Sequence, residues 1–124
     1  MTKLGSFITI VDDDQSVRES LPDLVKEFGF TARAFSSAQE FLESGSLSKA
    51  ECVILDVAMR EMTGPELWSE LKHRGIGIPI IFITARRDEA LRARLIKEGA
   101  VDCLFKPFAD TALLHALNVA LRTS

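Results

Sequence analysis

The chain has 124 residues, with 15 Lys and Arg against 18 Asp and Glu, a formal net charge of −3 and 47% hydrophobic residues. This length suits one domain with its own hydrophobic core and is too short for two ordinary domains. The slightly acidic balance argues against a stand-alone nucleic-acid binder, which needs a clustered Lys/Arg face, and no run of about 18 apolar residues is present that could cross a membrane.

The first part of the chain alternates short apolar blocks with segments of helical spacing. Residues 7–11 are predicted to form a strand, and the apolar residues after them recur at helical intervals up to Gly29, where we expect the helix to end. Residues 31–35 are predicted to form a second strand. Ser37 and Glu40 then have the spacing of a capping box, which predicts that a short helix begins there.

The second part of the chain continues the same alternation. Pro65 suits the first turn of a helix, where its missing N–H costs little. Acidic residues at the start of the segment 88–98 favour another helix. The elements predicted in this part are strands near 52–55, 79–83 and 101–105, and helices that begin at Gly64, occupy 88–98 and occupy 109–121.

Five strands that alternate with five helices imply a parallel sheet, because parallel strands need crossover connections. Strands buried on both faces should be continuously apolar, as residues 52–55 and 79–83 are. No internal repeat, linker or low-complexity segment appears. We therefore expect residues 1–124 to form a single α/β domain in which helices cover both faces of the sheet.

Polar residues follow the predicted strands at the edge where parallel sheets bind their ligands, outside the carboxyl ends of the strands. They are Asp12, Asp13 and Asp14 after the first strand, Asp56 after the third, Thr84 and Ala85 after the fourth, and Lys106 after the fifth. Singly, each has an ordinary structural explanation, and Asp14 can simply cap the first helix. Together, the carboxylates would repel one another unless a cation joined them. Oxygen ligands without His or Cys favour Mg²⁺ over Zn²⁺.

A Mg²⁺ site beside a carboxylate, an ammonium and a hydroxyl has the parts for phosphoryl transfer, in which a protein mainly supplies position and counter-charge. Asp56 could attack phosphorus and give an acyl phosphate. Lys106 would neutralise one phosphoryl oxygen, and the Thr84 hydroxyl with the Ala85 amide would take another. No P-loop and no Ser–His pairing competes with this interpretation. A flavin carrier on the same fold is set aside, because the acids after the first strand would repel its phosphate.

At these residues the sequence closely resembles the receiver domain of two-component response regulators, over essentially the whole chain. The motifs are Ile10-Val11-Asp12-Asp13, Leu55-Asp56-Val57-Ala58-Met59 with Gly64 beyond it, Ile83-Thr84-Ala85 and Lys106-Pro107-Phe108. Other segments, such as Phe35-Ser36-Ser37-Ala38, are similar to the FixJ-like subgroup of LuxR-type transcriptional regulators. The resemblance implies a flavodoxin-like sheet with the strand order 2-1-3-4-5.

The resemblance also implies roles for individual residues. Asp56 would accept a phosphoryl group from a histidine kinase with the help of Mg²⁺. Asp13 and Asp56 would hold the ion with the backbone carbonyl of Ala58, and Asp12 would act mainly through a water on the ion. The phosphoryl group would be bound by Thr84, Ala85 and Lys106. The peptide bond before Pro107 is expected to be cis.

In such a receiver, phosphorylation would be passed on through the fourth helix, the fifth strand and the fifth helix. The recipient would be a partner, a second copy of the chain, or a DNA-binding output domain, which this chain lacks. The protein is expected to be no enzyme, but a phosphoacceptor that assists its own phosphorylation and dephosphorylation. Cys52 and Cys103 lie in apolar stretches without metal-ligand spacing. Cysteines of this kind, together with the absence of a signal peptide before the first strand, predict a cytoplasmic protein. No contact with a membrane is expected.

Two positions depart from the family pattern. Arg60 stands where receivers usually have Pro, and it adds a positive charge near the site. Cys103 stands three residues before Lys106, where the family has its switch aromatic, so a Thr84–aromatic movement cannot operate with this thiol in the same way. Phe105 lies on the same face but about 7 Å along the strand. These departures favour an alternative function, a phosphorylation-independent interaction module, whereas the complete set of acids, Thr and Lys favours the switch.

Overall fold

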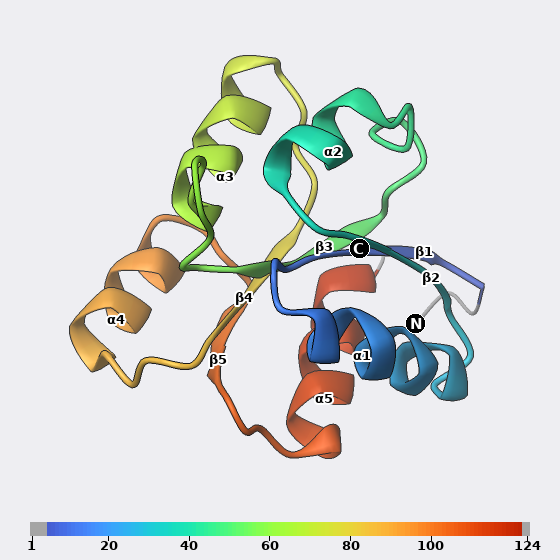
Figure 1. Ribbon diagram of the computed structural model, residues 1–124. Coiled ribbons are helices and arrows are strands. Elements are labelled where there is room, and N and C mark those ends of the chain that lie inside the picture. Colours follow the sequence, from blue (N-terminus) through green and yellow to red (C-terminus); the bar gives the residue numbers. More distant parts are fainter. Residues whose placement is uncertain (1–4, 123–124) are drawn as a thin grey trace.

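The computed structural model describes residues 5–122, which form a five-stranded parallel sheet with helices on both faces (Figure 1). The strands are β1 (Phe7–Val11), β2 (Thr31–Phe35), β3 (Cys52–Asp56), β4 (Ile80–Thr84) and β5 (Asp102–Phe105). The helices are α1 (Gln15–Glu27), α2 (Ala38–Glu43), α3 (Gly64–His73), α4 (Glu89–Lys97) and α5 (Asp110–Leu121). The strand order β2-β1-β3-β4-β5 confirms the predicted fold class. None of the helices within residues 5–122 has the length and apolar character needed to span a membrane.

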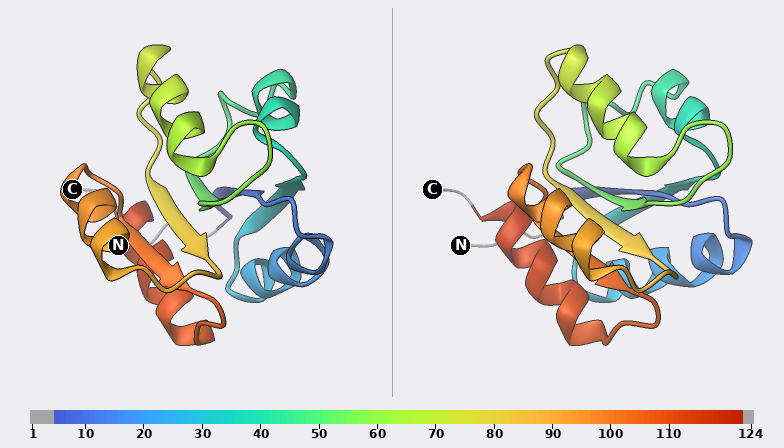
Figure 2. Two further views of the ribbon diagram at one scale, coloured as in Figure 1. Left: turned by 60° about the vertical axis from the view of Figure 1, so that its left-hand side comes forward. Right: turned by 90° about the vertical axis from the view of Figure 1, so that its left-hand side faces the viewer.

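Helices lie on both faces of the sheet, as Figure 2 shows in two further views, and a hydrophobic layer on each face holds them to it. On one face, α1 and α5 pack on the sheet through residues such as Leu21, Val25 and Leu117. On the other face, α2, α3 and α4 contribute residues that include Phe41, Leu67 and Leu95. Burial of both faces explains why β3 and β4 have no exposed position.

The carboxyl ends of the strands differ slightly from the prediction. Asp56 and Thr84 are the last residues of β3 and β4, where the sequence suggested that both follow their strands. The reason is the sheet register, because Asp56 lies opposite Ile83 of β4 and Thr84 lies opposite Phe105 of β5. Both polar side chains are therefore fixed by strand backbone and not by a loop.

The helix caps were predicted in part. The Ser37 hydroxyl accepts a hydrogen bond from the Glu40 N–H at 3.1 Å, as expected at the start of α2. The Glu40 carboxylate, however, accepts from the Ser36 N–H at 2.9 Å, one residue before the position that a capping box requires. A complete capping box, which was not predicted, is found at α3 instead, between Thr63 and Glu66.

Gly64 begins α3 against the end of β3. It is buried, and its N–H donates a hydrogen bond to the Val57 carbonyl at 2.9 Å, which closes the loop between β3 and α3. A Cβ at this position would overlap the backbone carbonyl oxygen of Asp56 and would lie 3.1 Å from the Phe82 ring. The close approach of α3 to the Asp56 backbone thus requires the absence of a side chain.

We expect Gly64→Ala to lower the free energy of unfolding by about 1–3 kcal/mol, because the backbone of Asp56 or the start of α3 must move. Gly77→Ala is the matched control, since a Cβ there would meet no atom within 4 Å. Urea denaturation of the two variants checks this prediction. Equal stability of both variants would contradict it.

Candidate functional site

Three carboxylates meet where β1 and β3 end. Asp12 and Asp13 directly follow β1, and Asp56 ends β3. One carboxylate oxygen of each lies within 4.8 Å of those of the other two. Asp12 is fully buried and Asp56 is 6% exposed, whereas Asp13 is partly buried. The structure therefore brings together the three side chains that the sequence proposed as metal ligands.

Asp14, the third acid in this run, has a different role. Its side chain accepts hydrogen bonds from the N–H and the hydroxyl of Ser16, at 2.9 and 2.8 Å, and it caps α1. These bonds, with the side-chain bond first, lower the pKa of Asp14. It is exposed and stands outside the carboxylate cluster. Asp14 therefore serves as the helix cap, the structural role that its position after the first strand allowed.

Lys106 neutralises part of the charge of the three carboxylates. Its Nζ lies 3.0 Å from Asp12 Oδ2 and 3.7 Å from Asp56 Oδ1. The other oxygen of Asp12 accepts from the Asp14 N–H at 2.9 Å. The Lys106–Pro107 bond that follows is cis, as the family resemblance implied. One ammonium thus contacts two carboxylates and leaves the cluster with an excess of negative charge.

The pKa values reflect this imbalance. Burial, and after it the negative charge of Asp12, raise the pKa of Asp56 to about 6, although the positive charge of Lys106 acts in the opposite direction. Burial alone would lower the pKa of Lys106, but its hydrogen bond with Asp12 and the charge of Asp56 outweigh burial and raise this pKa above the usual value. Lys106 therefore stays protonated, while ionised Asp56 is held in an unfavourable environment.

We expect Asp56→Asn to stabilise the metal-free protein at about pH 7.5 by about 1–2 kcal/mol, because the ionised carboxylate is disfavoured in the folded state. The pKa of Asp56 is raised on folding, so the folded state binds this proton more tightly and wild-type stability falls as the pH rises through about 6. The advantage of the variant should accordingly shrink towards about pH 5. Urea denaturation in EDTA, with Asp14→Asn as the control, measures both effects. A variant less stable than wild type at the higher pH would refute the expectation.

Thr84 lies at the same edge of the sheet, at the end of β4. Its side chain is buried, and its hydroxyl oxygen accepts from the Arg86 N–H at 3.2 Å. Its carbonyl oxygen accepts from the Lys106 N–H at 2.8 Å, which ties the ends of β4 and β5 together. Ala85, the next residue, is exposed. Because the Thr84 hydroxyl acts as an acceptor towards Arg86, its hydrogen is left available for donation to a ligand.

Cys103 is part of the hydrophobic core. It is 1% exposed, lies opposite Phe82 of β4, and belongs to the hydrophobic layer that contains Leu95 of α4. Burial raises the pKa of its thiol to about 11, so the thiol stays neutral. Its carbonyl oxygen accepts from Arg92 Nε at 3.0 Å, and the same guanidinium is 3.0 Å from the Asp102 carboxylate. Arg92 thus links α4 to β5 next to the predicted switch position.

The structure adds one residue to the site that the sequence had noted only as an extra charge. The Arg60 N–H donates to Asp13 Oδ2 at 3.2 Å, and Arg60 Nε lies 3.9 Å from the same oxygen. The departure from proline at this position was the signal that could have pointed to this contact. The Ala58 N–H contributes as well, by hydrogen bonding that lowers the pKa of Asp56.

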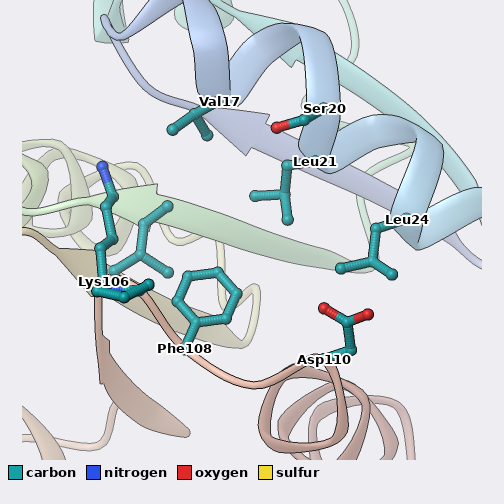
Figure 3. A pocket seen from close by; sticks show the side chains of 9 residues that line it. Val17, Ser20, Leu21, Leu24, Lys106, Phe108 and Asp110 are labelled. Atoms are coloured by element: carbon teal, nitrogen blue, oxygen red, sulfur yellow. The ribbon is translucent and has the colours of Figure 1, made fainter.

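A groove of about 480 Å³ lies beside Lys106, between α1 and the start of α5. Figure 3 shows the apolar side chains of α1 facing Phe108, with Lys106 at one end and Asp110 at the other. The lining residues are Val17, Ser20, Leu21, Leu24, Ile83, Lys106, Pro107, Phe108 and Asp110. A mainly apolar surface thus begins at a residue of the candidate site.

Comparison with known proteins gives consistent matches along the chain. The family model for the response regulator receiver domain matches residues 8–118. The response regulator protein TodT of Pseudomonas putida is 43% identical over 122 residues, which cover 98% of this chain and 54% of TodT. The chain thus spans about half the length of the curated relatives that it matches.

Comparison with solved structures agrees with this family match. The response regulator StyR has a TM-score of 0.84 and 42% identity over 93% of this chain and 58% of StyR. The structure FixJ-N has a TM-score of 0.82 and 34% identity over 97% of this chain and 94% of its own. The predicted resemblance to FixJ-like receivers is confirmed.

Proposed function

This chain belongs to the family of response regulator receiver domains, and from this membership we propose that it is a phosphorylation-operated switch in which Asp56 accepts a phosphoryl group from a histidine kinase. The observation that carries the proposal is the cluster of the Asp12, Asp13 and Asp56 carboxylates, two of which, Asp12 and Asp56, lie beside the ammonium of Lys106. The protein itself would be no enzyme, but it would assist its own phosphorylation and dephosphorylation.

Receiver domains bind Mg²⁺ at an acidic pocket, and the residues of this chain fit that ion. The three side chains offer only carboxylate oxygens, which hard cations prefer, and the cluster keeps an excess of negative charge that a divalent cation would remove. Asp13, Asp56 and the carbonyl of Ala58 would hold the ion, with Asp12 beside them. When bound, Mg²⁺ supplies positive charge that offsets the negative charge of the phosphoryl oxygens.

The residues of the chain itself would then perform the transfer. A carboxylate oxygen of Asp56 forms a bond to phosphorus while the bond from phosphorus to the donor imidazole breaks, and the imidazole leaves with the bonding electrons. Lys106 would donate hydrogen bonds to one phosphoryl oxygen. The Thr84 hydroxyl and the Ala85 amide would donate to another. The new charge of about −1.5 to −2 would draw Thr84 towards Asp56.

Transmission would run through α4, β5 and α5, as the family resemblance implies. Arg92 supports this path, because it joins α4 to the backbone of Cys103 and to the carboxylate of Asp102. Cys103 stands where the family has an aromatic residue, and its smaller side chain would leave space for the movement of Thr84. Relatives named as transcriptional regulatory proteins match this chain over about half of their length. We therefore propose that this receiver acts in a cytoplasmic regulator of transcription. An output domain outside residues 1–124 would contact DNA in that regulator.

The groove between α1 and α5 is the surface that we assign to the histidine kinase, because it begins at Lys106. Leu24→Glu should reduce phosphotransfer from a kinase that phosphorylates the wild-type chain by about tenfold or more, because a charge would enter an apolar contact. Phosphorylation by acetyl phosphate should stay unchanged, because this small donor does not need the groove. A variant slowed equally with both donors would contradict the assignment.

The direct test of the proposed function is incubation with acetyl phosphate in the presence of Mg²⁺ or EDTA, followed by intact-mass measurement. We expect a gain of one phosphoryl group with Mg²⁺ and none in EDTA. No gain under conditions that phosphorylate another receiver would support the alternative, a receiver that binds its partner without phosphorylation. Arg60 and Cys103 are the two residues that favour this alternative.

A further inference from the structure

The contact between Arg60 and Asp13 concerns a candidate metal ligand that Lys106 does not neutralise. Within residues 5–122, the ion pairs of Lys106 are with Asp12 and Asp56, and Arg60 is the cation that pairs with Asp13. We propose that Arg60 is a built-in competitor of Mg²⁺, which occupies Asp13 in the metal-free protein and weakens the affinity of the site. This inference rests on the proposed metal site and adds a residue that sets its affinity.

Two groups of Arg60 converge on one oxygen. The backbone N–H donates to Asp13 Oδ2 at 3.2 Å, and the guanidinium Nε lies 3.9 Å from the same atom. An oxygen that accepts a hydrogen bond and faces a positive charge is a poorer ligand for a second cation. Mg²⁺ must therefore displace the guanidinium, or share Oδ2 with it, to use this oxygen as a ligand, and at the other oxygen of Asp13 it still meets the positive charge of Arg60 nearby.

The exposure of the pair shows that this competitor is displaceable. The Arg60 side chain is 91% exposed and that of Asp13 is 28% exposed, so the guanidinium can move into water at low cost. The backbone N–H is held more firmly, because the loop between β3 and α3 is closed at its base by the hydrogen bond from Gly64 to Val57. Proline, which receivers usually carry at this position, has neither the N–H nor the charge. The competition therefore follows from the residue in which this chain departs from its family.

Titration of the purified chain with MgCl₂ by calorimetry tests the proposal. Arg60→Ala should bind Mg²⁺ about two- to fivefold more tightly than wild type, the range expected for an exposed ion pair. Arg60→Lys should stay close to wild type, because the charge is retained. Arg60→Pro, which also lacks the N–H, should bind at least as tightly as Arg60→Ala. The gain should shrink at high salt, since salt screens the exposed guanidinium.

Arg94→Ala is the matched control. Arg94 is also exposed and its Nε lies 3.7 Å from a Glu98 carboxylate oxygen, but this pair is on α4 and not in the carboxylate cluster. Its Mg²⁺ affinity should equal that of wild type. If wild type binds Mg²⁺ and neither Arg60→Ala nor Arg60→Pro binds it more tightly, the role of Arg60 is refuted while the metal site stands. If wild type does not bind Mg²⁺ at all, both proposals fail.

Discussion

Asp56→Asn is expected to abolish the gain of a phosphoryl group from acetyl phosphate and Mg²⁺. An amide oxygen is a much weaker nucleophile than a carboxylate oxygen, so the acyl phosphate cannot form at this position. The neighbouring acids are poorly placed to take over. Asp12 is fully buried and engaged with Lys106 and the Asp14 N–H, and one oxygen of Asp13 is engaged by Arg60. Intact mass after incubation should therefore show the unmodified variant.

Asp14→Asn is the control for this experiment. It removes a carboxylate from the same loop, but Asn caps helices as well as Asp does and Asp14 is not in the carboxylate cluster. This variant should gain one phosphoryl group at the wild-type rate. A phosphorylated Asp56→Asn protein would show that another side chain is the acceptor, and peptide mapping would identify it.

Much of the fold follows from local pattern. Continuous apolar runs predict the buried strands, and helical periodicity with caps predicts the helices between them. The strand order does not follow from local pattern. Parallel strands need crossover connections, but this requirement leaves the order of the strands in the sheet open, and here the order came from the family resemblance. The ends of β3 and β4 were also missed, since a polar residue such as Asp56 or Thr84 continues a strand when its backbone finds a partner across the sheet.

The candidate site, like the fold, could be predicted from the sequence only in part. That Asp12, Asp13, Asp56 and Lys106 share one edge follows from their position after parallel strands. Which acids point at one another does not follow, because Asp14 has the same chemistry as its neighbours and turns to Ser16 instead. The contact of Arg60 depends on the direction of a backbone N–H in a loop that includes Glu61 with a φ of 66°. Residue identity alone does not specify that direction.

Lys106→Met is expected to lower the free energy of unfolding in EDTA by about 2–4 kcal/mol, the cost of leaving a buried carboxylate without its partner. Asp12 is fully buried, and its Oδ2 is 3.0 Å from the ammonium that the variant lacks. Mg²⁺ should recover much of this loss, because the variant leaves more negative charge for the ion and binding to the folded state stabilises it. Urea denaturation in EDTA and in MgCl₂ measures both effects, and Lys49→Met, at an exposed position, should change stability by less than about 0.5 kcal/mol.

The same variant separates the structural role of Lys106 from its role in transfer. With saturating Mg²⁺ and the fold recovered, phosphorylation by acetyl phosphate should still be about 100-fold slower, because one donor to the phosphoryl oxygens is missing. A folded variant that is phosphorylated at the wild-type rate would confine Lys106 to holding Asp12 and Asp56 together. A variant as stable as wild type in EDTA would instead mean that the ammonium of Lys106 contributes no net stability to the folded state beside Asp12.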